Sequence, residues 1–179
     1  TTYKLVWGDF CSWYLEMIKP EYQHPIDQAT YDRTIHLFED ILKILHPFMP
    51  FISEEIWHLI KERSVNESLI LASWPEEKTF DSQIITEAAQ VFEVVSQVRN
   101  LRASKGMSPK ESLDLTINAK NEGLYSRFES VLTKLANLSS FGFGTVVENA
   151  MSFVVKADEC FIPAGDSINV EEERENITK

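Results

Sequence analysis

The sequence has 179 residues, of which 44% are hydrophobic and 25% are charged, as is typical of a globular protein with one domain and at most a small appendage. Its formal net charge of −11 argues against a protein that binds nucleic acid over its whole surface. No apolar run approaches the roughly 20 residues of a membrane-spanning helix, and residues 1–7 lack a signal-peptide pattern. Cys11 and Cys160 stand outside any CxxC pair, which favours reduced thiols in a cytoplasmic protein over a disulfide framework.

The first half of the chain is predicted to be helical. Apolar residues recur every three or four positions over residues 3–19 and again over residues 31–45, the spacing that gathers them on one side of a helix. Pro47 and Pro50 are expected to end the second helix, because proline donates no ladder hydrogen bond and disfavours the helical state before it.

A third helix is expected to begin near Ser53, which is a suitable N-cap and is followed by two acids in the first turn. Phe48 and Phe51 are expected to fill the corner before this helix, and Trp57 to anchor it one turn further on. The short run at residues 69–74 is predicted to be extended and to be fixed by its tryptophan.

A long fourth helix is predicted from about Asp81 to Gly106, where glycine adopts the left-handed conformation at low cost. Beyond it the apolar period changes from three or four to two, which is typical of a half-buried strand. The remaining elements are predicted to be a strand, a short helix and a tight β-hairpin, at residues 113–117, 124–135 and 152–162 respectively.

The predicted fold class is therefore mainly α. A helical bundle is expected over residues 1–105 and a small α+β subdomain over residues 106–168, with the boundary in the turn at residues 104–109. The polar stretch 169–179 is expected to begin a further helix.

No pattern in the sequence indicates catalysis. None of the four histidines pairs with another at the i, i+4 spacing of a helical zinc site. The glycines of residues 141–144 lack the lysine and helix of a phosphate-binding loop, and neither cysteine lies in a motif that activates a nucleophile. We predict no catalytic residue, no metal site and no cofactor in this chain.

Residues 46–57, HPFMPFISEEIW, are much more specific than the rest. They resemble the helix-break-helix signature in the anticodon-binding domain of the class I aminoacyl-tRNA synthetases for valine, isoleucine, leucine and methionine. Residues 9–16 (DFCSWYLE) and residues 98–103 (VRNLRA), the latter followed by SPK at residues 108–110, resemble the valine enzymes in particular. Residues 152–155 and 161–163 resemble the strands that precede the coiled-coil arm of those enzymes.

The resemblance implies that the chain is the tRNA-binding, anticodon-recognising part of a valine–tRNA ligase, which attaches valine to its tRNA using ATP. Signatures of the HIGH and KMSKS type are absent from these residues, so ATP use and catalysis would belong to a catalytic body outside them. The resemblance further implies a cytoplasmic, monomeric enzyme, with residues 169–179 as the start of its coiled-coil arm. Two alternatives stay open: the same region of an isoleucyl or leucyl enzyme, and a helical protein-interaction module without RNA binding.

The predicted tRNA-binding residues are four bases in a stretch without an acid, namely Arg99, Arg102, Lys105 and Lys110. Cations of this kind neutralise the phosphate backbone of a bound RNA. The alternative is that they cover the bundle, with their stems on apolar surface and their charges paired to acids such as Asp114. Weaker candidates are Arg33, Lys43 and Arg63.

Overall fold

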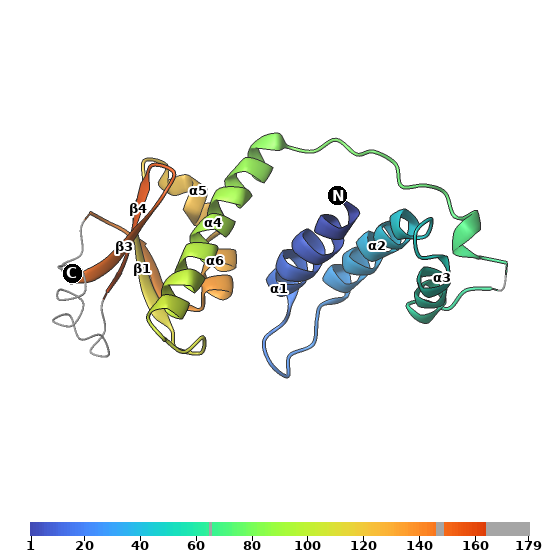
Figure 1. Cartoon of the computed structure of the whole chain (residues 1–179), viewed down its shortest axis with the longest axis horizontal. Coiled ribbons are helices and arrows are strands. Elements are labelled where there is room, and N and C mark those ends of the chain that lie inside the picture. Colours follow the sequence, from blue (N-terminus) through green and yellow to red (C-terminus); the bar gives the residue numbers. More distant parts are fainter. Residues whose placement is uncertain (65, 146–148, 164–179) are drawn as a thin grey trace. The chain divides into compact units, whose positions relative to one another are not determined.

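The computed structural model describes residues 1–64, 66–145 and 149–163. The chain divides into two compact units, Thr1–Phe80 and Asp81–Lys179. Helices build the first unit, and a sheet with helices builds the second (Figure 1). The predicted fold class, mainly α with a small α+β part after the helices, is confirmed. Among the helices that the structure describes, none is both long enough and apolar enough to cross a membrane.

The division between the units falls before the long helix α4 (Ser82–Ser104) and not after it. This helix packs on α6 (Glu129–Ala136) and on strand β3 (Ala150–Val155). The predicted boundary at residue 105 assigned the helix to the bundle because an apolar stripe shows that a helix is buried, and does not show which element covers it. The predicted segments 164–168 and 169–179 lie outside the described residues.

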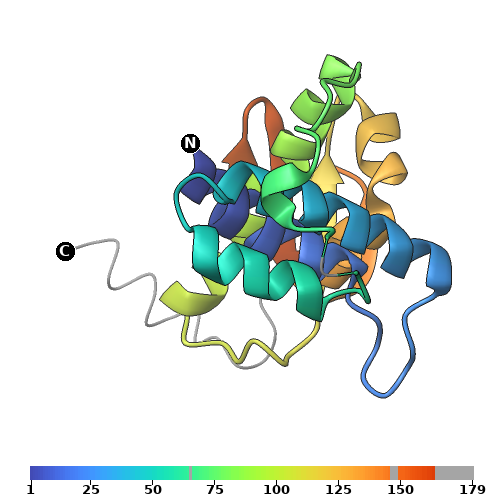
Figure 2. The ribbon, with the colours of Figure 1, turned by 90° about the vertical axis from the view of Figure 1, so that its right-hand side faces the viewer.

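The first unit begins with a π-helical stretch, η1 (Lys4–Tyr14), which continues into α1 (Leu15–Ile18). Helix α2 (Gln28–Leu45) follows and packs against α3 (Pro50–Leu59), as Figures 1 and 2 show. The core of α2 and α3 contains Leu42, Trp57 and Leu69. The ring of Phe10 stacks on that of Phe38, with 5.6 Å between centroids, and thereby ties η1 to α2.

The corner between α2 and α3 differs from the prediction. Helix α3 starts with Pro50 in its first turn, where the missing N–H costs nothing because the first amides of a helix have no intrahelical partner. Ser53 is therefore inside the helix and not its N-cap. Its buried hydroxyl donates to the carbonyl of Met49 at 2.8 Å and lies 2.8 Å from Nδ1 of His46.

One aromatic residue of this corner is buried and two are exposed. Trp57 is buried and donates from Nε1 to the carbonyl of Glu67 at 2.9 Å, so it is the predicted anchor. Phe48 and Phe51 are 74% and 91% exposed and do not fill the corner. The apolar run after α3 forms a 3₁₀ turn, η2 (Leu69–Leu71), and not an extended segment. Trp74 is likewise mostly exposed.

In the second unit the described residues form a four-stranded sheet of order β2-β1-β4-β3. β1 (Leu113–Asn118) runs parallel to β2 (Leu138–Phe143) and antiparallel to β4 (Asp158–Pro163). The buried residues of β1 alternate with exposed or half-buried ones, as predicted. The predicted hairpin is also present, as antiparallel β3 and β4. Parallel strands need a long connection, which here consists of α5 (Glu122–Arg127) and α6.

Two predictions in this unit need correction. The single helix expected over residues 124–135 is two helices, separated at Phe128. Strand β2 was not expected, because Leu138–Phe143 is LSSFGF and lacks the alternation that identified β1. Its place in the sheet comes from pairing with β1, a long-range contact that a local pattern does not contain.

Candidate nucleic-acid interface

The C-terminal end of α4 carries the predicted basic cluster and ends in a hydrogen-bonded turn. Gly106 has a φ of 65°, as predicted. The amide of Met107 donates to the carbonyl of Arg102 at 2.9 Å, and that of Gly106 donates to the carbonyl of Ala103 at 3.3 Å. This pair of bonds is the Schellman motif, which satisfies carbonyls that the helix itself leaves without partners. The turn therefore fixes the backbone on which Lys105 stands.

Arg102 is only 5% exposed and does not present its charge to solvent. Its Nη1 donates to the carbonyls of Ser108 and Glu111, and its Nη2 to those of Ala136 and Asn137 at 3.0 Å each. Burial lowers the pKa of the guanidinium, and the Glu111 carboxylate opposes that shift. Arginine nevertheless stays protonated in proteins.

Arg102 was predicted to contact tRNA. In the structure its guanidinium instead joins α4, the loop 106–111 and the end of α6. A stretch of basic residues does not reveal which of them points inward. The structure also does not pair Arg102 with Asp114, whose carboxylate instead accepts from the hydroxyls of Ser139 and Ser140 at 2.8 and 2.6 Å.

Asn137 completes this connection and was not predicted. It caps α6 in the left-handed conformation, with a φ of 50°, which asparagine tolerates better than most residues. Its Nδ2 donates to the carbonyls of Pro109 and Glu111 at 3.0 and 3.1 Å. An asparagine directly after an apolar helix is a recognisable C-terminal signal, whereas its two bonds to a distant loop are not.

Arg99, Lys105 and Lys110 are exposed. Arg99 donates from Nη2 to the carbonyl of Leu135 at 3.0 Å, so its guanidinium lies at the C-terminal end of α6, where a helix dipole favours positive charge. Lys105 is the C-cap of α4, and Lys110 stands in the loop that Arg102 and Asn137 hold. Of the four predicted residues, three are therefore surface cations: one at the C-terminal end of α6, one at that of α4 and one in the loop after α4.

Two of the weaker candidates form ion pairs within the first unit. Arg63 forms an ion pair with Glu39, and its guanidinium lies 3.7 Å above the ring centre of Trp57. The Nζ of Lys43 lies 3.0 Å from a carboxylate oxygen of Asp40. Both side chains are mostly buried, so they stabilise the bundle and are poorly placed to meet a phosphate.

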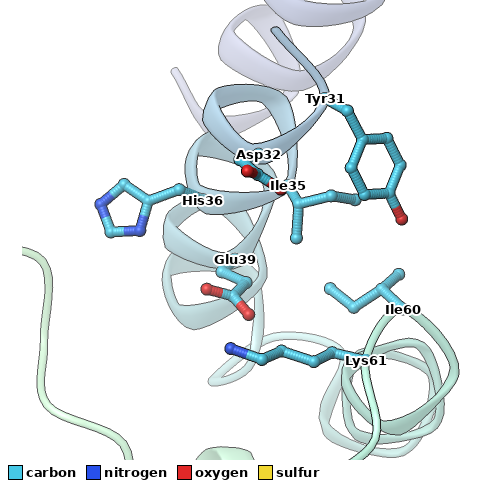
Figure 3. Close-up of a pocket in the computed structure, with 7 residues that line it drawn as sticks. All are labelled: Tyr31, Asp32, Ile35, His36, Glu39, Ile60 and Lys61. Atoms are coloured by element: carbon cyan, nitrogen blue, oxygen red, sulfur yellow. The ribbon is translucent and has the colours of Figure 1, made fainter. Parts of the chain in front are cut away.

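A second feature, which the sequence did not indicate, is a pocket of about 410 Å³ formed by α2 and the residues just after α3 (Figure 3). It combines an aromatic ring, two aliphatic side chains, two carboxylates, an imidazole and an ammonium group. The lining residues are Tyr31, Asp32, Ile35, His36, Glu39, Ile60 and Lys61. Residues one helical turn apart on α2 share a face, so residues 31, 32, 35, 36 and 39 meet on one side of the helix.

Both places offer groups that can bind a ligand. Within residues 1–64, 66–145 and 149–163, no group of three or more His, Cys, Asp or Glu side chains is arranged to hold a metal ion. The helix end offers charge to an anion, and the pocket offers an aromatic face beside hydrogen-bond acceptors.

Comparison with known proteins identifies a family. The family described as the anticodon-binding domain of tRNA ligase matches residues 1–117. The valine–tRNA ligase of Christiangramia forsetii is 47% identical over 178 residues, which cover 99% of this chain and 20% of that protein. The valine–tRNA ligases of Parabacteroides distasonis and Bacillus cereus are 44% and 33% identical, over 96% and 99% of this chain and 19% and 21% of their own lengths. The chain thus spans about a fifth of the curated relatives it matches.

Proposed function

Because the chain belongs to the family of anticodon-binding domains of tRNA ligases, we propose that it binds tRNA, and specifically valine tRNA, for a valine–tRNA ligase. The observation that carries the valine assignment is the extent of the similarity. The family match ends at residue 117, whereas the similarity to valine–tRNA ligases continues over 99% of the chain. An isoleucyl or leucyl enzyme, the alternative from the sequence, is less well supported.

The proposed contacts are the surface cations at the end of α4. Arg99, Lys105 and Lys110 are exposed, and neutralising phosphates with such groups supplies much of the affinity for RNA. We keep Arg102 in the proposal as the residue that holds the loop carrying Lys110, through its bonds to the carbonyls of Ser108 and Glu111.

The catalytic steps of the proposed enzyme are assigned to residues outside this chain. The described residues offer sites for binding, so amino-acid activation with ATP and transfer to tRNA are proposed to occur in the remaining four-fifths of the ligase, which is the main partner of this chain. We further propose that the enzyme is monomeric and acts in the cytoplasm.

The test is the salt dependence of binding by the 179-residue chain. A valine tRNA transcript should bind more tightly than an isoleucine or leucine tRNA transcript, and the affinity should fall as salt rises. Lys105→Ala and Lys110→Ala should each weaken binding and reduce the slope of log K against log salt by about 1. Lys78→Ala, which changes an exposed lysine in the segment before α4, is the matched control and should change neither quantity.

Three outcomes would contradict the proposal. Equal binding of all three tRNAs would remove the valine assignment, and unchanged salt slopes in the lysine variants would remove the assigned contacts. Absence of RNA binding would favour the protein-interaction module. The observation behind that alternative is the exposure of apolar side chains on and after α3, including Phe51, Leu59 and Leu71 at 91%, 74% and 76%.

A further inference from the structure

The pocket between α2 and the end of α3 has no role in the proposed phosphate contacts. We propose that it receives one unstacked base of the tRNA, and that it selects a base with an exocyclic amino group over uracil. This inference rests on the proposed function, because it names the part of the RNA that the first unit reads.

The apolar wall of the pocket suits a base. Tyr31 is 44% exposed, and its ring stands beside Ile35, with Ile60 facing it from the chain after α3 (Figure 3). Sequence-specific RNA recognition uses bases that are splayed out of the helix and stacked on aromatic side chains. The ring of Tyr31 is the larger of the two aromatic surfaces among the lining residues, the other being the imidazole of His36.

The polar wall determines which base fits. Asp32 and Glu39 contribute carboxylates, which only accept hydrogen bonds when ionised. The amino groups of cytosine, adenine and guanine can donate to them, as in the pairing of acidic side chains with cytosine N4. Uracil presents a carbonyl oxygen where cytosine presents its amino group. In uracil, one hydrogen-bond acceptor would therefore face another, the carboxylate.

Both carboxylates are held in place by neighbours. Glu39 is paired with Arg63, and both of these side chains are mostly buried. Asp32 accepts from Nε2 of Gln28 at 2.8 Å through one of its oxygens. Acceptors fixed before binding lose little conformational entropy when a base arrives, which favours selectivity.

The charge of the pocket is compatible with RNA in spite of its two acids. Arg63 is paired with Glu39, and the side chain of Lys61 lies below Glu39 in Figure 3. The imidazole of His36 is 3.9 Å from the carboxylate of Asp40. The pocket volume of about 410 Å³ lies within the range of roughly 300–1,000 Å³ that is usual for small-ligand sites.

The test uses the 179-residue chain and valine tRNA transcripts in which amino groups of the anticodon loop are removed one at a time. Adenine is replaced by purine, guanine by hypoxanthine and cytosine by uracil. Tyr31→Ala should weaken binding of the unmodified transcript by about tenfold, the usual effect of losing one base–aromatic stack. Tyr31→Phe keeps the ring and should bind within about twofold of the wild type. Tyr22→Ala, at a tyrosine that is 90% exposed, is the matched control and should leave binding unchanged.

At one loop position, removal of the amino group should weaken binding to the wild type by about five- to tenfold. The same removal should matter less in Asp32→Asn or Glu39→Gln, since an uncharged amide oxygen accepts from the amino group more weakly than a carboxylate does, and the amide nitrogen can donate to the carbonyl of uracil. Unchanged binding by Tyr31→Ala, or the absence of any position coupled to either carboxylate, would overturn the pocket assignment.

The failure of this inference is separable from that of the proposed function. If Lys105→Ala and Lys110→Ala reduce the salt slope while the pocket variants bind like the wild type, the pocket assignment alone is wrong. If the wild-type chain binds none of the transcripts, both proposals fall.

Discussion

At the scale of single residues, the second unit buries two groups that ionise in alkali. Cys160 is fully buried in β4, and burial, together with the nearby Asp158 carboxylate, raises the pKa of its thiol to about 12. Burial also raises the pKa of Tyr125, whose hydroxyl donates to Asp158 at 2.9 Å. Gln90 donates to the same carboxylate at 2.7 Å, so α4, α5 and β4 meet at one buried polar group.

The free energy of unfolding of this unit is expected to fall as the pH rises above about 9. The unfolded thiol loses its proton near its ordinary value of 9.0 and the folded thiol near 12, so the folded state binds more protons in between and ionisation favours unfolding. Ionisation of the Cys160 thiol alone should lower the free energy of unfolding by up to about 1.4 kcal/mol per pH unit in this range. Urea denaturation followed by far-ultraviolet circular dichroism between about pH 7 and pH 10 measures it. Cys160→Ala should show a flatter dependence, and parallel curves would contradict the assignment.

At the scale of secondary-structure elements, α4, α6 and the loop 106–111 are joined by one side chain. Arg102 donates to carbonyls of the loop and of the C-terminal end of α6. A lysine carries the same charge but lacks the planar fork of donors that reaches several acceptors at once. The elements are thus held together by the geometry of the guanidinium and not by charge alone.

Arg102→Lys is therefore expected to lower the free energy of unfolding by about 2–3 kcal/mol, because it leaves buried carbonyls without donors. Arg127→Lys is the matched control. That arginine pairs with Glu87 at 3.2 Å and its side chain is 53% exposed, so the change should stay within about 0.5 kcal/mol. Chemical denaturation of both variants measures the difference, and equal losses would show that the fork does not matter.

At the scale of the whole molecule, each compact unit has buried side chains of its own. Leu42 and Trp57 belong to the core of the first unit, and Leu132 and Ile162 are fully buried in the second. All four tryptophans of the chain precede residue 81. Tryptophan fluorescence therefore reports on the first unit alone, while circular dichroism reports on both.

This distribution makes the independence of the units measurable. Leu132→Ala should destabilise the second unit by about 2–5 kcal/mol, as truncation of a buried leucine generally does. We expect the urea midpoint from circular dichroism to fall for the second unit while the midpoint from tryptophan fluorescence stays in place. A matched fall in both midpoints would show instead that the two units unfold together.

The sequence by itself determined the features that depend on local patterns. The periods of three to four and of two located α2, α4 and β1, the glycine at 106 marked the end of α4, and residues 46–57 pointed to the family. These features are legible because helix and strand geometry place side chains on faces at fixed spacing. The exposed cations Arg99, Lys105 and Lys110 were found from composition in the same way.

Only the tertiary structure decided which elements share a core and which side chains face it. It moved α4 into the second unit, turned Arg102 inward, placed Ser53 inside α3 and left Phe48 exposed, and it paired an unpatterned segment with β1 as β2. It also gathered Tyr31, Asp32 and Glu39 of α2 with residues that follow α3 to form the pocket. The physical reason is common to these cases. Burial and hydrogen-bond partners are set by contacts between residues far apart in the chain, and a basic or aromatic residue has the same local pattern whether it faces solvent or the core.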